Sequence, residues 1–146
     1  MKRNELIGVL DESIALGLRT KLIFKKLGFA KCILTNEFKN FVEMVKLEKP
    51  SLLVVDLPLI MKETDSLLKD YNIPTICMTY AQLPEEMEYC MNLRSAIAYS
   101  QKPINQFFAN CISNKVKFKS DSNPKTLMTN FHLPSKLSLE KYNNRL

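Results

Sequence analysis

The stretch Leu52-Leu-Val-Val-Asp56 joins four consecutive apolar residues to one acidic residue. A short run of aliphatic and β-branched side chains is typical of a strand that is buried on both faces. Such strands belong to parallel sheets, which bind ligands at the carboxyl ends of their strands. The sequence therefore predicts a central strand at 51–55, with Asp56 at the ligand-binding edge of a parallel sheet.

Three further apolar runs of strand length also lead into polar residues. Residues 6–10 precede Asp11 and Glu12, residues 75–78 precede Thr79, and residues 95–99 precede Lys102 by a short turn. A short strand is also expected at 31–34. Because the carboxyl ends of parallel strands meet at one edge, we expect these three acids, one hydroxyl and one ammonium to converge.

Helix signals alternate with the strand signals. Helices are expected at 14–27, 37–48, 62–71 and 84–92, and a last helix is expected to start at Pro103. The first helix carries Ile14, Leu18 and Leu22, with Ser13 as its N-cap and Gly28 as its stop. The last is expected to present Ile104, Phe107, Phe108, Cys111 and Ile112 on one apolar face. Five strands and five helices in alternation predict a doubly wound α/β sandwich around a five-stranded parallel sheet, a flavodoxin-like architecture.

Composition restricts the class of protein. The chain has 146 residues, of which 46% are hydrophobic and 25% charged, as expected for one globular domain. No apolar stretch approaches the roughly 20 residues of a membrane span, and the N-terminus does not read as a secretory signal. Cys32, Cys77, Cys90 and Cys111 lack zinc or redox spacing, and the single histidine, His132, argues against a catalytic triad. A cytoplasmic protein is expected.

Residues 116–146 differ from the rest of the chain. From Lys115 onward there are seven Lys and Arg against two acidic residues, which accounts for most of the net charge of +6. We interpret 116–146 as a basic, polar C-terminal extension, either flexible or partly packed on the body. Its charge allows salt-sensitive, non-specific contact with nucleic acid, and a plain solvated extension is the alternative.

Four motifs occur in order along the body of the chain. They are Val9-Leu-Asp-Glu-Ser-Ile14, Leu53-Val-Val-Asp56, Cys77-Met-Thr79 and Tyr99-Ser-Gln-Lys-Pro103. Together they make residues 4–114 resemble the receiver domain of two-component response regulators, including the chemotaxis receivers. We therefore interpret 1–115 as a receiver-like α/β domain.

The resemblance implies a specific chemistry. Asp56 is the phosphoacceptor, and Thr79 and Lys102 contact the phosphoryl group. Mg²⁺ is bound by Asp11, Glu12, Asp56 and the backbone carbonyl of Pro58, and Tyr99 is the aromatic switch residue. A receiver is a signalling domain rather than an enzyme, apart from Mg²⁺-dependent self-phosphorylation and dephosphorylation. The implied partners are a sensor histidine kinase or a phosphotransfer protein and a downstream protein target, with a homodimer as a further option and no membrane.

The chain also departs from the receiver pattern. Ile60 stands where the family usually has proline, Lys62 and Glu63 stand near its usual Asp-Gly pair, and Tyr80 follows Thr79 where a small residue is preferred. Glu12 replaces the commoner aspartate. Two alternatives therefore stay open, namely a degenerate receiver that binds proteins without phosphorylation and an unrelated flavodoxin-like α/β protein.

Single residues have plainer interpretations as well. Asp11 and Glu12 would also suit the N-terminus of a helix, and Asp56 would suit an ordinary loop after a strand. Thr79 is compatible with a local turn, Lys102 with a solvated surface position, and Tyr99 with a fixed place in the core.

Overall fold

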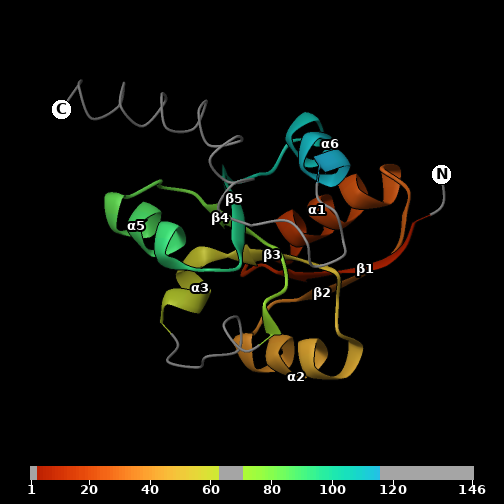
Figure 1. Ribbon diagram of the computed structural model, residues 1–146, viewed down its shortest axis with the longest axis horizontal. Coiled ribbons are helices and arrows are strands. Elements are labelled where there is room, and N and C mark those ends of the chain that lie inside the picture. The colour runs from red at the N-terminus through yellow and green to blue at the C-terminus, as the bar shows by residue number, and fades with distance from the viewer. Residues whose placement is uncertain (1–2, 63–70, 116–146) are drawn as a thin grey trace.

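The five strands form one parallel sheet in the order β2-β1-β3-β4-β5. The structure is a computed structural model and describes residues 3–62 and 71–115. The strands are β1 (Arg3–Leu10), β2 (Phe29–Thr35), β3 (Leu52–Asp56), β4 (Thr75–Thr79) and β5 (Ala96–Gln101). The predicted doubly wound α/β fold, with β3 at the centre of its sheet, is confirmed (Figure 1).

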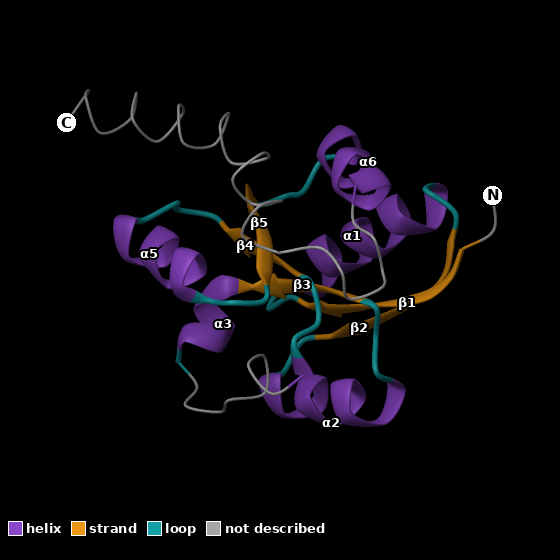
Figure 2. Ribbon diagram, in the orientation of Figure 1, coloured by secondary structure: helices purple, strands orange, loops and turns teal. Residues whose placement is uncertain are grey.

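Helices cover both faces of this sheet (Figure 2). They are α1 (Ile14–Lys26), α2 (Phe38–Glu48), α3 (Leu57–Met61), α5 (Pro84–Asn92) and α6 (Gln106–Lys115). One core layer includes Phe24 of α1 and Ile112 of α6, and the opposite layer includes Phe41 of α2 and Met87 of α5. The side chains of β3 alternate between the two layers, as the period of two along a strand requires. Every residue of β3 is therefore buried.

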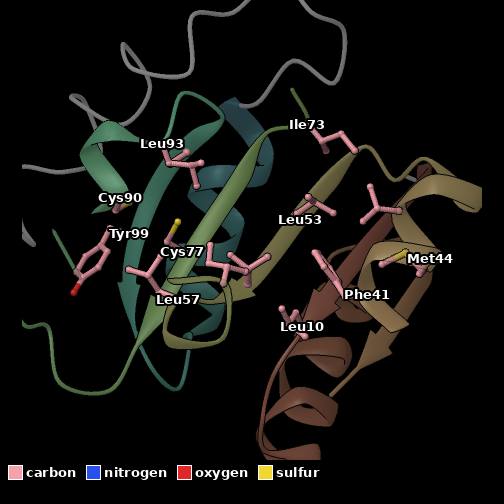
Figure 3. Packing of buried hydrophobic residues seen from close by; sticks show 14 of the residues in the cluster. Leu10, Phe41, Met44, Leu53, Leu57, Ile73, Cys77, Cys90, Leu93 and Tyr99 are labelled. Carbon is pink, nitrogen blue, oxygen red and sulfur yellow. The ribbon is translucent and has the colours of Figure 1, made fainter. Parts of the chain in front are cut away.

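The second layer extends from α2 to α5 (Figure 3). Phe41 and Met44 lie at its α2 side, and Cys90 and Tyr99 lie at its α5 side. Tyr99 is 2% exposed, so its ring belongs to the core. This burial agrees with the plainer interpretation of Tyr99 and leaves its proposed role as a switch as a prediction.

The ends of α1 follow the predicted signals. The Ser13 side chain accepts a hydrogen bond from the Leu16 amide at 3.2 Å, and Gly28 follows the helix with a φ of 99° that favours glycine. Gly17 lies where α1 approaches β2 so closely that a Cβ would collide with Leu34. These local features fix the position of α1 directly after Asp11 and Glu12.

Strand register brings the predicted polar residues to one edge. Leu10 pairs with Val55, so Asp11 and Asp56 are the next residues of two adjacent strands. Asp56 pairs with Met78, and Thr79 pairs with Gln101, the residue before Lys102. The sheet therefore aligns the carboxyl ends of β1, β3, β4 and β5.

Two helices differ from the sequence prediction. Leu57–Met61 forms α3, which was not predicted because Pro58 interrupts the apolar run; proline is tolerated in the first turn, where its missing amide has no intrahelical role. The last helix starts at Gln106 rather than Pro103, and the Asn105 side chain accepts a hydrogen bond from the Phe108 amide at 2.7 Å. Most of the predicted helix at 62–71 lies outside the described residues.

The predicted apolar faces of two helices also need correction. Phe107 is 79% exposed, whereas Ala109 and Ile112 are buried. In α1 the residues Ile14, Leu18 and Leu22 are each at least half exposed, and the buried positions include Ile23 and Phe24. For α1 the predicted stripe is therefore exposed. For α6 only Phe107 departs from the predicted face, because Ile104 and Ile112 are buried and Phe108 and Cys111 are partly buried.

The part of the chain that the structure describes contains no helix that is long and apolar enough to cross a membrane.

Candidate functional site

Lys102 joins two carboxylates at the carboxyl edge of the sheet. Its Nζ lies 2.7 Å from Asp11 Oδ1 and 2.9 Å from Asp56 Oδ2. The Lys102 and Asp11 side chains are each 1% exposed, and the Asp56 side chain is 5% exposed. We call Asp11, Asp56 and Lys102 the acid–lysine cluster. Lys102 is therefore a buried ion-pair partner and not a solvated surface lysine.

Local backbone geometry holds this cluster in place. The Ser13 amide donates to Asp11 Oδ1 at 2.9 Å, and the Glu12 amide donates to Asp56 Oδ2 at 3.2 Å. The Lys102 amide donates to the Thr79 carbonyl at 2.8 Å, and the peptide bond that follows Lys102 is cis. The turn after β1 therefore holds both Asp11 and Asp56, and the end of β4 holds the backbone of Lys102.

The charge of Lys102 is maintained by its partners. Burial alone would lower the pKa of its ammonium group, because it disfavours the charged form. Hydrogen bonds to Asp11 and Asp56, together with their negative charges, outweigh burial and raise the pKa of Lys102. The cluster thus has one stable cation facing two buried acidic side chains.

Asp11 also has an unsatisfied oxygen. Its Oδ2 is buried and has no hydrogen-bond partner among the described residues. A buried carboxylate oxygen without a donor is costly, and a cation would satisfy it. Mg²⁺ prefers oxygen ligands and needs only one or two carboxylates from a protein, since it retains water. Asp11 and Asp56 therefore fit a Mg²⁺ site.

The two remaining predicted metal ligands are Glu12 and the backbone carbonyl of Pro58. The Glu12 side chain is exposed, and its contact with Asp56 is made by its backbone amide. Pro58 lies in the first turn of α3, two residues after Asp56. In the described ranges, no group of three or more His, Cys, Asp or Glu side chains is arranged to hold a metal ion.

Thr79 makes a contact that the sequence analysis did not predict. It is fully buried, and its hydroxyl donates to Glu86 Oε2 at 2.5 Å. The other oxygen of Glu86 accepts from the Leu83 amide at 3.0 Å. The Thr79 hydroxyl thus points to α5, and only the backbone carbonyl of Thr79 contacts Lys102. The expected convergence holds for Asp11, Asp56 and Lys102, but the Thr79 side chain has a different partner.

Tyr80 covers the ammonium group from the solvent side. Its ring centroid lies 4.5 Å from Lys102 Nζ, within the range of a cation–π interaction, and the residue is 55% exposed. The Gln101 side chain donates to the Tyr80 carbonyl at 3.1 Å. Tyr80 therefore belongs to the site, at a position where the sequence shows a departure from the receiver pattern.

Tyr99 lies in the core layer that packs against α5. Burial raises the pKa of its phenol, and the negative charge of Glu86 adds to this effect. The neighbouring thiol of Cys77 likewise has a raised pKa, because it forms a hydrogen bond with Cys90 and is buried. All four cysteines are free.

Solved structures with the same fold include receiver domains. A response regulator receiver domain protein from Clostridium thermocellum matches with a TM-score of 0.64 and 13% identity, over 75% of this chain and 91% of that one. A receiver domain from Methylobacillus flagellatus, described as CheY-like, matches with a TM-score of 0.62 and 14% identity, over 79% and 100% of the two chains. No protein-family model and no curated protein sequence matches this chain.

A chemotaxis response regulator of Vibrio cholerae has the same fold, with a TM-score of 0.57 and 13% identity over 72% of this chain and 92% of that one. At these identities the likeness concerns the fold. The chain thus has the flavodoxin-like fold of response regulator receiver domains, and the resemblance drawn from its four motifs is confirmed at that level.

Proposed function

We propose that the protein is a response regulator receiver that accepts a phosphoryl group on Asp56. The observation that supports this most directly is the acid–lysine cluster at the carboxyl edge of a receiver-like sheet. Both hydrogen bonds to Asp56 from described residues reach Oδ2, so we assign Oδ1 as the attacking oxygen. The donor is a phosphohistidine of a sensor histidine kinase or phosphotransfer protein, or a small acyl phosphate.

In the proposed transfer, Asp56 Oδ1 forms a bond to phosphorus while the bond from phosphorus to the donor breaks. The donor nitrogen or acyl oxygen keeps the electron pair of the broken bond, and a histidine donor becomes neutral after taking up a proton. Lys102 stabilises the charge on the phosphoryl oxygens. When bound by Asp11, Asp56, Glu12 and the Pro58 carbonyl, Mg²⁺ would offset the repulsion between donor and acceptor. The protein then acts as a phosphoacceptor rather than as an enzyme with a separate substrate.

An exposed apolar stripe supports a protein partner. Ile14, Leu18 and Leu22 recur every four residues along α1, so they lie on one face, and each is at least half exposed. Exposed apolar surface of this kind often marks an interaction site. Because α1 begins just after Asp11 and Glu12, a donor protein bound there would reach the acid–lysine cluster.

The proposal extends to the protein's location and partners. Four free cysteines are expected in a reducing compartment, so we place the protein in the cytoplasm. The downstream target is a protein, and a homodimer and non-specific nucleic-acid contact through 116–146 remain secondary predictions. Residues 116–146 lie outside the described residues, so the boundary between a 1–115 domain and its extension also stays a proposal.

A second candidate is a receiver fold that binds proteins without phosphorylation. The contact of Tyr80 with Lys102 favours it, because the ring covers the cation that would receive the phosphoryl group. In that case the acid–lysine cluster serves only as a buried ion-pair network.

Intact-mass measurement separates the two candidates. The protein is incubated with acetyl phosphate and Mg²⁺ beside an Asp56→Asn variant. One phosphoryl adduct on the wild type, absent from the variant, is the expected result. An unmodified wild type that also shows no Mg²⁺-dependent change would rule out phosphotransfer and favour the protein-binding module.

A further inference from the structure

A buried carboxylate outside the acid–lysine cluster has no part in the function proposed above. Glu86 is the third residue of α5 and is 4% exposed. Each of its oxygens accepts one hydrogen bond, Oε2 from the Thr79 hydroxyl at 2.5 Å and Oε1 from the Leu83 amide at 3.0 Å. A buried glutamate held in this way connects the end of β4 to the first turn of α5.

The direction of the Thr79 side chain follows from the alternation of β4. Ile76 and Met78 pack in the layer of α1 and α6, whereas Cys77 packs in the layer of α5. Thr79 is two residues after Cys77, so its side chain leaves the strand on the α5 side. Its backbone carbonyl meanwhile accepts the Lys102 amide at 2.8 Å. Thr79 is therefore tied to the cluster by its backbone and to Glu86 by its side chain.

A threonine hydroxyl has a single proton to donate. Hydrogen bonds to a carboxylate are charge-assisted and stronger than neutral ones. We propose that Glu86 is a positioning residue that competes with a phosphoryl group on Asp56 for the Thr79 hydroxyl. This inference rests on the proposed phosphorylation of Asp56. In the resting protein Glu86 retains the hydroxyl, and phosphorylation must break this bond before Thr79 can bind a phosphoryl oxygen.

Breaking the bond has a consequence for α5. A buried carboxylate that loses a donor is costly, so Glu86 must find another donor or move. Its second oxygen holds the Leu83 amide at the start of α5, and its charge also acts on the buried phenol of Tyr99. Loss of the Thr79 contact is therefore transmitted to the first turn of α5.

The test compares Glu86→Gln with Glu85→Gln. Glu85 is the exposed neighbour in the same turn, so both variants remove one negative charge from the start of α5. Glutamine keeps the shape of Glu86 and one oxygen for the Leu83 amide, but the amide nitrogen that then faces Thr79 cannot accept the hydroxyl proton. Each variant is incubated with acetyl phosphate and Mg²⁺ until the ratio of phosphorylated to unmodified protein is steady. We expect about a tenfold higher ratio for Glu86→Gln and no change for Glu85→Gln.

A Thr79→Val background shows whether Glu86 acts through the hydroxyl. Valine has the shape of threonine without the proton, so Glu86→Gln should have no effect on the ratio in that background. Glu86→Ala, which removes the acceptor entirely, is measured as well. The midpoint of thermal unfolding provides a readout of the folded state for every variant.

The outcomes separate the two claims. A phosphorylated wild type with a higher ratio in Glu86→Gln that depends on Thr79 supports the inference. A phosphorylated wild type whose ratio does not change in Glu86→Gln or Glu86→Ala, or changes equally without the hydroxyl, overturns the inference and leaves phosphorylation intact. If neither the wild type nor any Glu86 variant forms an adduct, the proposed function fails, and the role of Glu86 fails with it.

Discussion

Lys102 Nζ lies 2.9 Å from Asp56 Oδ2, although the two residues are 46 positions apart in the chain. The same nitrogen is 2.7 Å from Asp11 Oδ1. One buried ammonium thus separates two buried carboxylates at the edge where the sheet would bind its ligand. This arrangement gives each buried carboxylate a cationic partner and places that cation beside the proposed attacking group.

Replacing Lys102 with methionine should strongly destabilise the protein. The change leaves Asp11 and Asp56 buried without their cation, and breaking a buried ion pair from one side costs about 3–5 kcal/mol. The free energy of unfolding from urea titration measures the effect. Lys46→Met on the exposed face of α2 is the matched control and should stay within about 0.5 kcal/mol of wild type. Equal stability of the two variants would contradict the ion-pair role of Lys102.

Mg²⁺ should raise the midpoint of thermal unfolding, because a ligand that binds only the folded state stabilises it. Asp11→Asn should abolish this increase, since it removes a charged oxygen from the site, even if the variant is less stable without metal. The measured quantity is the difference between midpoints with and without Mg²⁺. Glu43→Gln, at an exposed position of α2, should keep the full increase. A similar increase in both variants would show that Mg²⁺ binds elsewhere.

Tyr99 should make stability fall at alkaline pH. Its folded pKa is raised, chiefly by burial, above the ordinary value of 10.0. Its contribution is therefore fully present below pH 10 and is lost as pH rises from 10 toward the folded pKa, because only the unfolded phenol ionises in that interval. In Tyr99→Phe the free energy of unfolding should fall less steeply above pH 10. Urea titrations at several pH values give both slopes, and identical slopes would argue against a buried phenol.

The sequence predicted the sheet and the acid–lysine cluster for the same physical reason. Apolar runs buried on both faces form parallel strands, and the residues that follow them reach a common edge whatever their spacing in the chain. Asp11, Asp56 and Lys102 therefore come together as expected. The receiver motifs gave the same answer, because they consist of the residues at these strand ends.

Side-chain partners within the site were harder to predict. A threonine at a strand end can point to either side of the sheet, and only the register of β4 directs Thr79 to α5. Glu86 is three residues after Leu83, the N-cap of α5. Leucine lacks the side-chain oxygen of a usual N-cap, so the sequence shows no capping box that would indicate a role for Glu86. The segment Leu57–Met61 resembled a loop because of Pro58, although proline suits a first helical turn.

Tyr80 should contribute a small amount of stability through Lys102. Its ring faces the ammonium at 4.5 Å and is partly exposed, where a cation–π contact contributes about 0.5–1 kcal/mol. Tyr80→Ala should lower the free energy of unfolding by that amount, and Tyr80→Phe should leave it nearly unchanged. If the ring also covers the site, Tyr80→Ala should take up a phosphoryl group from acetyl phosphate faster than Tyr80→Phe, as measured by intact mass. Equal stability of the two variants would mean that the ring does not interact with the cation.

The face of α6 that packs on the sheet can be tested by substitution. Ile112 is fully buried and Phe107 is 79% exposed, although the sequence pattern placed both on one apolar face. Removing a buried isoleucine side chain costs about 2–5 kcal/mol, because burial is lost and a cavity remains. Ile112→Ala should therefore lower the free energy of unfolding by this amount, whereas Phe107→Ala should change it by less than about 0.5 kcal/mol. The reverse order would mean that Phe107, and not Ile112, packs against the sheet.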